Sequence, residues 1–307
     1  HPDGVHARGK GVRLDPPNAP YPHMNPITKA YYVLRYLGPG FVARRLHLSA
    51  TKHLGITRRR FQPKPRESIQ LADIVSDGIP TTLEGYCKHK YDHRPPFLFP
   101  FGKPPVIPAS IASLPGDRTP NLQCRLDHLR KDRCIYFFNQ PSPEAIDWYH
   151  NPFQDVREDS RRIWCDIPDF SPEQGDPRVL WEPSRAAWAL DLARAYGRCV
   201  DYPSSEVFWR WVDSWMPACP PFDGFQWKCG QESTVRLIAI LFAFWALPLD
   251  EQDAPRRWLQ MARLAWATGY RIVHHIDYAV SQNNNHALSE ACGLMLIARL
   301  FPEFRDA

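Results

Sequence analysis

The sequence predicts a mainly α-helical protein in which helical hairpins form a curved array or toroid, preceded by a Pro-rich, irregular N-terminal region. Two observations carry this prediction. From Trp181 onward, apolar residues recur at helical spacing in five segments, which are joined by short or Pro-rich links. Before Trp181, prolines are so frequent that long helices are not expected. A chain of 307 residues is long enough for one large domain or two.

The N-terminal part is expected to be an extension that carries one helix. Residues 1–25 are rich in Pro, Gly and charge and are expected to be loosely ordered. Residues 26–48 carry apolar residues at helical spacing, interrupted at Gly38-Pro39-Gly40. Basic residues gather between residues 44 and 60. We interpret them as a solvated helix face, and docking to a membrane surface or to a polyanion is the alternative.

Residues 61–175 combine frequent prolines with short aromatic pieces, such as the stretch from Pro95 to Pro100. Proline at this density suits irregular loops and short edge strands. Because disordered segments are usually poor in aromatic residues, we expect an ordered layer that covers the helices.

The five segments predicted as helices follow this layer. Short links between them indicate antiparallel hairpins, and their apolar period is too irregular for a coiled coil. They are residues 183–196, 205–215, 231–247, 255–276 and 287–300.

Composition excludes several classes of function. The 38 Lys and Arg against 33 Asp and Glu leave a net charge of +5, a mild preference for acidic partners that is too weak to indicate nucleic acid. None of the eight cysteines forms a C-x-x-C pair, so scattered reduced thiols are favoured over a zinc or redox site. No apolar run reaches the roughly 20 residues of a membrane span. We expect no cofactor.

The ends of the chain predict a piece of a longer protein. The sequence begins at His1, shows no signal peptide, and stops within a helical pattern at Ala307. The compartment stays open between cytoplasm and periplasm, and the oligomeric state is not indicated.

The stretch from Ser281 to His286 is the most informative for function. Three consecutive Asn residues and a His stand directly before the apolar run that begins at Ala287. Asn favours helix N-caps, and a helix start carries a partial positive charge that attracts anions. An amide, an imidazole and a helix N-terminus together suit a carboxylate on a ligand. An Asn-rich cap beside a surface His is the alternative.

Several ordered pieces of the chain resemble the heparinase II/III-like polysaccharide lyases, over roughly residues 65–305. The pieces, in chain order, are Ile146-Asp147-Trp148, Asn151-Pro152, Asp166 to Phe170, Gly175-Asp176, Val179 to Arg185, Leu192 to Tyr196, Gly224 to Trp227, Gly230-Gln231-Glu232 with Arg236, and Asn283 to His286 with Glu290 and Gly293-Leu294.

The resemblance implies an (α/α) toroid with a groove, followed by an antiparallel β-sandwich domain. Residues 65–307 are then an incomplete (α/α) toroid that lacks the sandwich, and residues 1–64 are an N-terminal extension with a basic helix. The resemblance also implies β-elimination of acidic polysaccharides that contain uronic acid. This reaction needs a group that neutralises the uronate carboxylate, a base and an acid.

The resemblance implies that Asn285, with help from His286, neutralises the uronate carboxylate. Gln231, Glu232 and Asn284 are then expected to contact the substrate. The catalytic Tyr and a sandwich-domain His would lie beyond Ala307. We therefore expect the chain by itself to hold the binding half of a site and to be inactive.

Two further residues are weaker candidates for substrate contact. His275 is a candidate because it precedes the Asn-rich stretch by one short segment. A metal site at His274 and His275 is not expected, because adjacent residues on a helix point about 100° apart and rarely bind the same ion. Of the tryptophans between 209 and 227, only Trp227 is expected to face the groove. Glu232 and Arg236, spaced i,i+4, are expected to form a structural ion pair.

Two other classes of function stay open. A toroidal glycoside hydrolase would need two carboxylates, for which Glu232 and Glu290 are the candidates. A non-catalytic protein that binds acidic polysaccharides is the second. Heparan sulfate, alginate and other uronate polymers are all possible substrates, and the mode of cleavage, endo or exo, is open. No cluster of Lys and Arg stands out between residues 225 and 290 beyond Lys228, Arg236 and Arg271, which slightly disfavours a highly sulfated chain.

Overall fold

The computed structural model describes residues 25–62, 68–104, 119–137, 140–159, 162–168 and 175–305. The chain divides into two compact units, residues 1–46 and 47–307. The loose segment expected at residues 1–24 lies outside the described residues. The boundary predicted at residue 64 stays a prediction.

Helix α1, Pro26–His53, confirms the helix predicted near the N-terminus. At Gly38 the backbone has φ 80° and ψ 166°, so α1 is two helical segments joined at a kink. Glycine adopts such positive φ values readily, and Pro39 cannot donate to the helical ladder. The kink therefore falls at the predicted interruption.

The larger unit is mainly helical, which confirms the predicted fold class. Its first helices are α2 (Ile56–Arg60), α3 (Leu71–Ile74), α4 (Leu83–Asp92) and α6 (Thr119–Arg130). The toroid helices are α7 (Pro177–Ser184), α8 (Ala187–Gly197), α9 (Ser204–Ala218), α10 (Gly230–Ala246), α11 (Ala254–Val273), α12 (Ile276–Ser281) and α13 (His286–Leu300). The short 3₁₀ helices are η3 (Trp164–Asp166) and η4 (Phe225–Trp227).

Strands are few and short. β1 (Ile135–Tyr136) pairs antiparallel with β2 (Gln140–Pro141), and β3 (His150–Asn151) pairs antiparallel with β4 (Val156–Arg157). This part agrees with the short strands predicted for the Pro-rich region. The ten-residue α4 and twelve-residue α6 were not predicted there. α4 occupies a Pro-free interval, because the nearest prolines in the sequence are Pro80 and Pro95.

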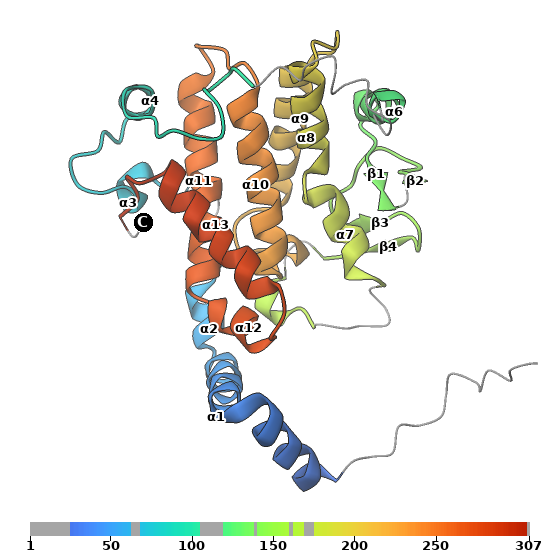
Figure 1. Cartoon of the computed structure of the whole chain (residues 1–307), viewed down its shortest axis with the longest axis vertical. Coiled ribbons are helices and arrows are strands. Elements are labelled where there is room, and N and C mark those ends of the chain that lie inside the picture. The colour runs from blue at the N-terminus through green and yellow to red at the C-terminus, as the bar shows by residue number, and fades with distance from the viewer. Residues whose placement is uncertain are drawn as a thin grey trace, which may run out of the picture. The chain divides into compact units, whose positions relative to one another are not determined.

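Helix α10 is the centre of the core. It packs against α8, α11 and α13, and 13 of its 17 residues are buried. Figure 1 shows α10 between α8 and α11, with α13 crossing it. A helix that is apolar on nearly all sides is typical of such a central position. The helical segment predicted at 183–196 is two helices, because Ala186 adopts a left-handed conformation with φ 59°.

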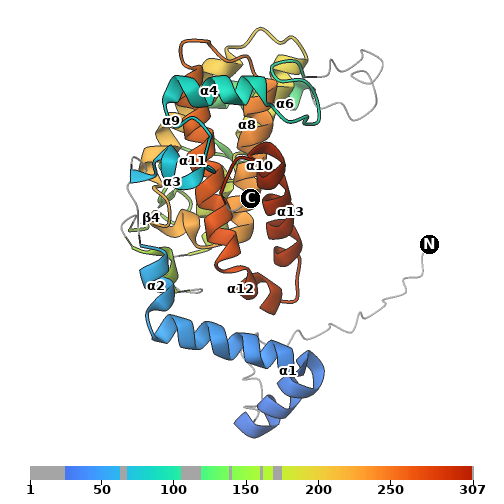
Figure 2. The ribbon, with the colours of Figure 1, turned by 90° about the vertical axis from the view of Figure 1, so that its left-hand side faces the viewer.

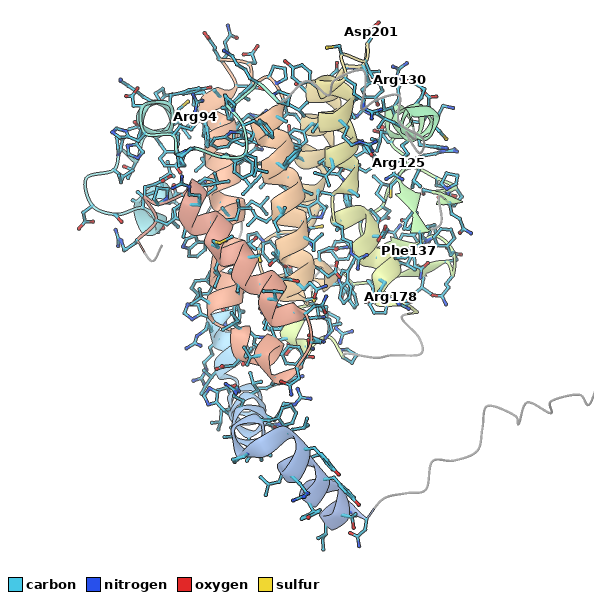
Figure 3. The ribbon with its side chains drawn as sticks, viewed as in Figure 1. Arg94, Arg125, Arg130, Phe137, Arg178 and Asp201 are labelled. Atoms are coloured by element: carbon cyan, nitrogen blue, oxygen red, sulfur yellow. The ribbon has the colours of Figure 1, made fainter. Side chains whose placement is uncertain are left out.

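The covering layer is tied to the toroid helices by polar contacts. α4 packs against α11 (Figure 2), and Lys90 donates to the Leu300 carbonyl at 2.7 Å and to Glu303 at 2.9 Å. On another side, Arg125 of α6 donates to Asp191 of α8 at 2.5 Å, and Figure 3 shows Arg125 between these helices. Within the described parts of the chain, no helix is both long enough and apolar enough to span a membrane.

Candidate functional site

The N-terminal halves of α10 and α13 pack closely at two glycines, Gly230 and Gly293. A Cβ atom at Gly230 would lie 2.3 Å from Oε1 of Glu290, and one at Gly293 would lie 2.8 Å from Cγ2 of Thr234. An alanine at either position would force its neighbour to shift; the Glu290 carboxyl is the end of a flexible side chain, whereas Thr234 is short and fully buried. The close packing brings the Asn-rich stretch, which precedes α13, near the start of α10.

Two of the three Asn residues have local structural roles in the backbone before α13. Asn283 has φ 50°, a left-handed conformation that Asn tolerates better than most residues. The side-chain carbonyl of Asn284 accepts a hydrogen bond from the backbone N–H of His286 at 3.0 Å. This local bond satisfies one of the unpaired N–H groups at the start of α13. The capping interpretation therefore applies to Asn284.

Asn285 differs from both. It occupies the N-cap position of α13, yet its side chain makes no capping hydrogen bond. The residue is exposed, and its amide has no hydrogen bond to any residue that the structure describes. An exposed amide at a helix N-terminus is available to a ligand that accepts hydrogen bonds.

The imidazole of His286 faces α10. Its Nδ1 lies 3.8 Å from Sγ of Cys229, the residue directly before α10. Burial lowers the pKa of His286, while the charge of Glu232 acts in the opposite direction. Burial also raises the pKa of Cys229 to about 11, so its thiol keeps its proton. If the thiol donates to Nδ1, the neutral ring carries its proton on Nε2.

Glu232 has a different partner from the one predicted. Both of its oxygens accept from Arg185, at 2.6 Å from Nε and 2.8 Å from Nη2, and Arg185 also donates to Glu182 at 2.7 Å. The predicted ion pair with Arg236 is wrong. The buried Arg236 guanidinium instead donates to the carbonyls of Ser184 and Gln226, each at 2.8 Å.

Gln231 and Glu290 each hold a buried oxygen that lacks a partner within the described residues, Oε1 of Gln231 and Oε2 of Glu290. Such atoms are rare in folded proteins, because desolvating them without a hydrogen bond is costly. Burial raises the pKa of Glu290 to about 7, against the opposing charge of Arg271. Gln231 is half-buried, so its amide lies close to the surface.

The structure does not bring Trp227 and His275, the two weaker candidates, to the polar residues at the starts of α10 and α13. Trp227 is only 1% exposed, and its indole N–H donates to the Cys219 carbonyl at 3.1 Å. The expectation that Trp227 faces a groove is therefore wrong, because its ring packs in the core against Trp215 and Phe222. His275 lies between α11 and α12 and lines a pocket to which Asn284, Asn285 and His286 do not contribute.

The geometry also disfavours a glycoside hydrolase. Glu232 and Glu290 are 5% and 3% exposed, and Glu232 is held by Arg185, so neither carboxyl is presented as a hydrolase would need. Among the described residues, no three His, Cys, Asp or Glu side chains are grouped so that they could hold a metal ion. Arg185 and Cys229 were missed as site residues, because their partners are remote in sequence.

The fold is thus a set of packed helices in which polar groups gather at the first turns of α10 and α13. The family described as Heparinase II/III N-terminus matches residues 125–307, which is more than half of the chain. The chain therefore belongs to this family of polysaccharide lyases, which confirms the resemblance. No curated protein and no solved structure matched the chain.

Proposed function

We propose that the protein containing this chain cleaves uronic-acid polysaccharides by β-elimination, and that Asn285 and His286 bind and neutralise the uronate carboxylate. The observation that carries the proposal is the unused, exposed amide of Asn285, the residue that precedes His286 with its neutral imidazole at the start of α13. Membership of a polysaccharide lyase family supports the reaction class.

The chemistry explains why these groups suit the task. In β-elimination a base removes the proton at C5 of the uronate, the C4–O glycosidic bond breaks, and a C4=C5 double bond forms. Removing the proton leaves negative charge that spreads into the carboxyl group. The amide N–H of Asn285, the Nε2–H of His286 and the N-terminus of α13 would all stabilise that charge.

The neighbouring residues have supporting roles in this proposal. Cys229 holds the ring of His286 in place, and the Arg185–Glu232 pair stabilises the first turn of α10. Asn284 offers its amide N–H groups to the sugar, and Gln231 does so as well, because its Oε1 is buried. We assign neither the base nor the acid to a residue of this chain.

The test is a panel of uronate polymers, including alginate and heparan sulfate, given to the protein that contains this chain. Ultraviolet absorbance of the unsaturated product reports β-elimination. We expect Asn285→Ala to lower the rate about 100-fold, the typical loss when one donor to a developing negative charge is removed. Asn283→Gly is the matched control, since it removes an amide two residues away but permits the positive φ.

Three results would contradict the proposal. Cleavage that survives Asn285→Ala unchanged would remove the residue from the reaction. A product without the double bond would indicate hydrolysis. Binding of uronate oligosaccharides without cleavage of any polymer would indicate a binding protein.

A further inference from the structure

A pocket of about 150 Å³ lies within the larger unit, beside the N-terminus of α12. One wall comes from the last turns of α1 and from α2, and includes Thr57 and Arg60. The other wall is the junction between α11 and α12, and includes His275 and Asp277. Most of the surface that lines the pocket is polar, so it suits a hydrated or charged ligand group better than an apolar one.

His275 lines this pocket at the junction of α11 and α12. Its ring is held by edge contacts to Trp164 and Phe61, with centroids at 4.9 and 6.4 Å. Burial lowers the pKa of His275 to about 2, so the ring is neutral and has one donor and one acceptor nitrogen. Neither ring nitrogen has a hydrogen-bond partner among the residues that the structure describes.

The electrostatic surroundings favour an anion. The charges that act on His275 are those of Arg271, Lys228 and Lys52, and all three are positive. Asp277 lines the same pocket, but its carboxylate is not among the charges that act on the ring. The guanidinium of Arg60 is exposed at the opposite wall and forms no ion pair with a described residue.

We propose that this pocket binds an anionic substituent, a carboxylate or a sulfate, on a second sugar of the same acidic chain. Arg60 supplies the charged contact and His275 a neutral hydrogen bond. The inference rests on the proposed function, since the first sugar is the uronate held at Asn285.

The position of the pocket fits such a second subsite. The six residues of α12 separate it from the Asn-rich stretch, a length of about 9 Å that a short oligosaccharide spans. Figures 1 and 2 both show α2 and α12 at the same end of α11. The pocket thus brings Arg60 of α2 to the N-terminal end of α12, while the Asn-rich stretch follows the C-terminal end of α12.

Calorimetric titration of the chain with uronate disaccharides and hexasaccharides, sulfated and unsulfated, tests the second subsite. We expect Arg60→Ala to weaken hexasaccharide binding about tenfold, as for loss of a hydrogen bond to a charged group, and to leave disaccharide binding unchanged. Arg60→Lys should restore part of the affinity. Arg59→Ala is the matched control, because Arg59 is exposed on the same helix and does not line the pocket.

Each outcome separates the two proposals. If only the sulfated hexasaccharide loses affinity in Arg60→Ala, the second subsite holds and its group is a sulfate. If Arg59→Ala and Arg60→Ala cost the same, a diffuse basic surface replaces the pocket. If Arg60→Ala has no effect while Asn285→Ala weakens both ligands, the pocket proposal fails and the proposed function stands. If Asn285→Ala weakens neither ligand, both proposals fail.

Discussion

The carboxyl group of Glu290 occupies the space that any side chain at position 230 would need. Beyond the 2.3 Å to Oε1, a Cβ at Gly230 would lie 2.6 Å from Cδ and 3.0 Å from Oε2 of Glu290. Gly230 thus leaves room for the Glu290 carboxyl between α10 and α13, the two helices at whose starts Cys229 and His286 meet.

Gly230→Ala is expected to lower the free energy of unfolding by about 1 to 3 kcal/mol, because α13 or the Glu290 side chain must shift. Urea denaturation measures the change. Gly269→Ala in α11 is the matched control: its nearest neighbour is the Cδ1 of Ile297 at 3.3 Å, and alanine has the better helix propensity. Equal stability of Gly230→Ala and the unchanged chain would contradict the prediction and would mean that the Glu290 side chain turns away at no cost.

Glu290 is expected to make stability fall as the pH rises towards neutral. Its folded-state pKa of about 7 exceeds the unfolded value of about 4.3, so the folded state holds an extra proton between these values. Glu290→Gln should remove this dependence and gain at most about 4 kcal/mol relative to the unchanged chain above pH 7. Denaturation across this pH range measures it, with Glu206→Gln on an exposed turn of α9 as the control.

Loss of Arg185 is expected to cost more than loss of an exposed arginine. Arg185→Ala leaves the buried Glu232 carboxylate without either of its hydrogen bonds, which typically costs about 3 to 5 kcal/mol. Arg178→Ala is the control, because Arg178 (Figure 3) is exposed on α7 and its partner Asp176 is only partly buried. Similar losses in the two variants would mean that Glu232 is solvated.

His275 is expected to stay neutral over the physiological range. Because its folded-state pKa is below the unfolded value of about 6.5, its contribution is present above that pH and is lost on acidification. Its ring signals in NMR should not titrate between about pH 5 and 8, and His275→Gln should reduce the acid sensitivity of the fold. A titration near the ordinary His value would contradict the buried aromatic setting.

Local patterns predicted the longest of the described helices but not the short ones. Apolar spacing identified α9, α10 and α13, and Gly38 with Pro39 predicted the kink in α1. The division of residues 183–196 was missed, because nothing in the sequence distinguishes the left-handed Ala186 from an ordinary helical alanine.

The candidate site was predictable only where it is local in sequence. The sequence indicated that the Asn-rich stretch could cap a helix, but not that Asn284 is the residue whose side chain does so. The ligand role assigned to Asn285 stays a prediction. The partner of Glu232 was predicted wrongly, because i,i+4 spacing favours Arg236 while Arg185 reaches Glu232 from another helix, 47 positions earlier. The burial of Trp227 depends in the same way on tertiary contacts that spacing does not encode.

Recognition of a uronate carboxylate by Asn285 is tested most directly by calorimetry with two matched disaccharides, one acidic and one with its carboxyl group reduced to an alcohol. The account predicts that the acidic form binds more tightly, and that Asn285→Ala weakens it about tenfold without affecting the reduced form. Equal binding of the two disaccharides, or an unchanged affinity of Asn285→Ala for the acidic one, would contradict it.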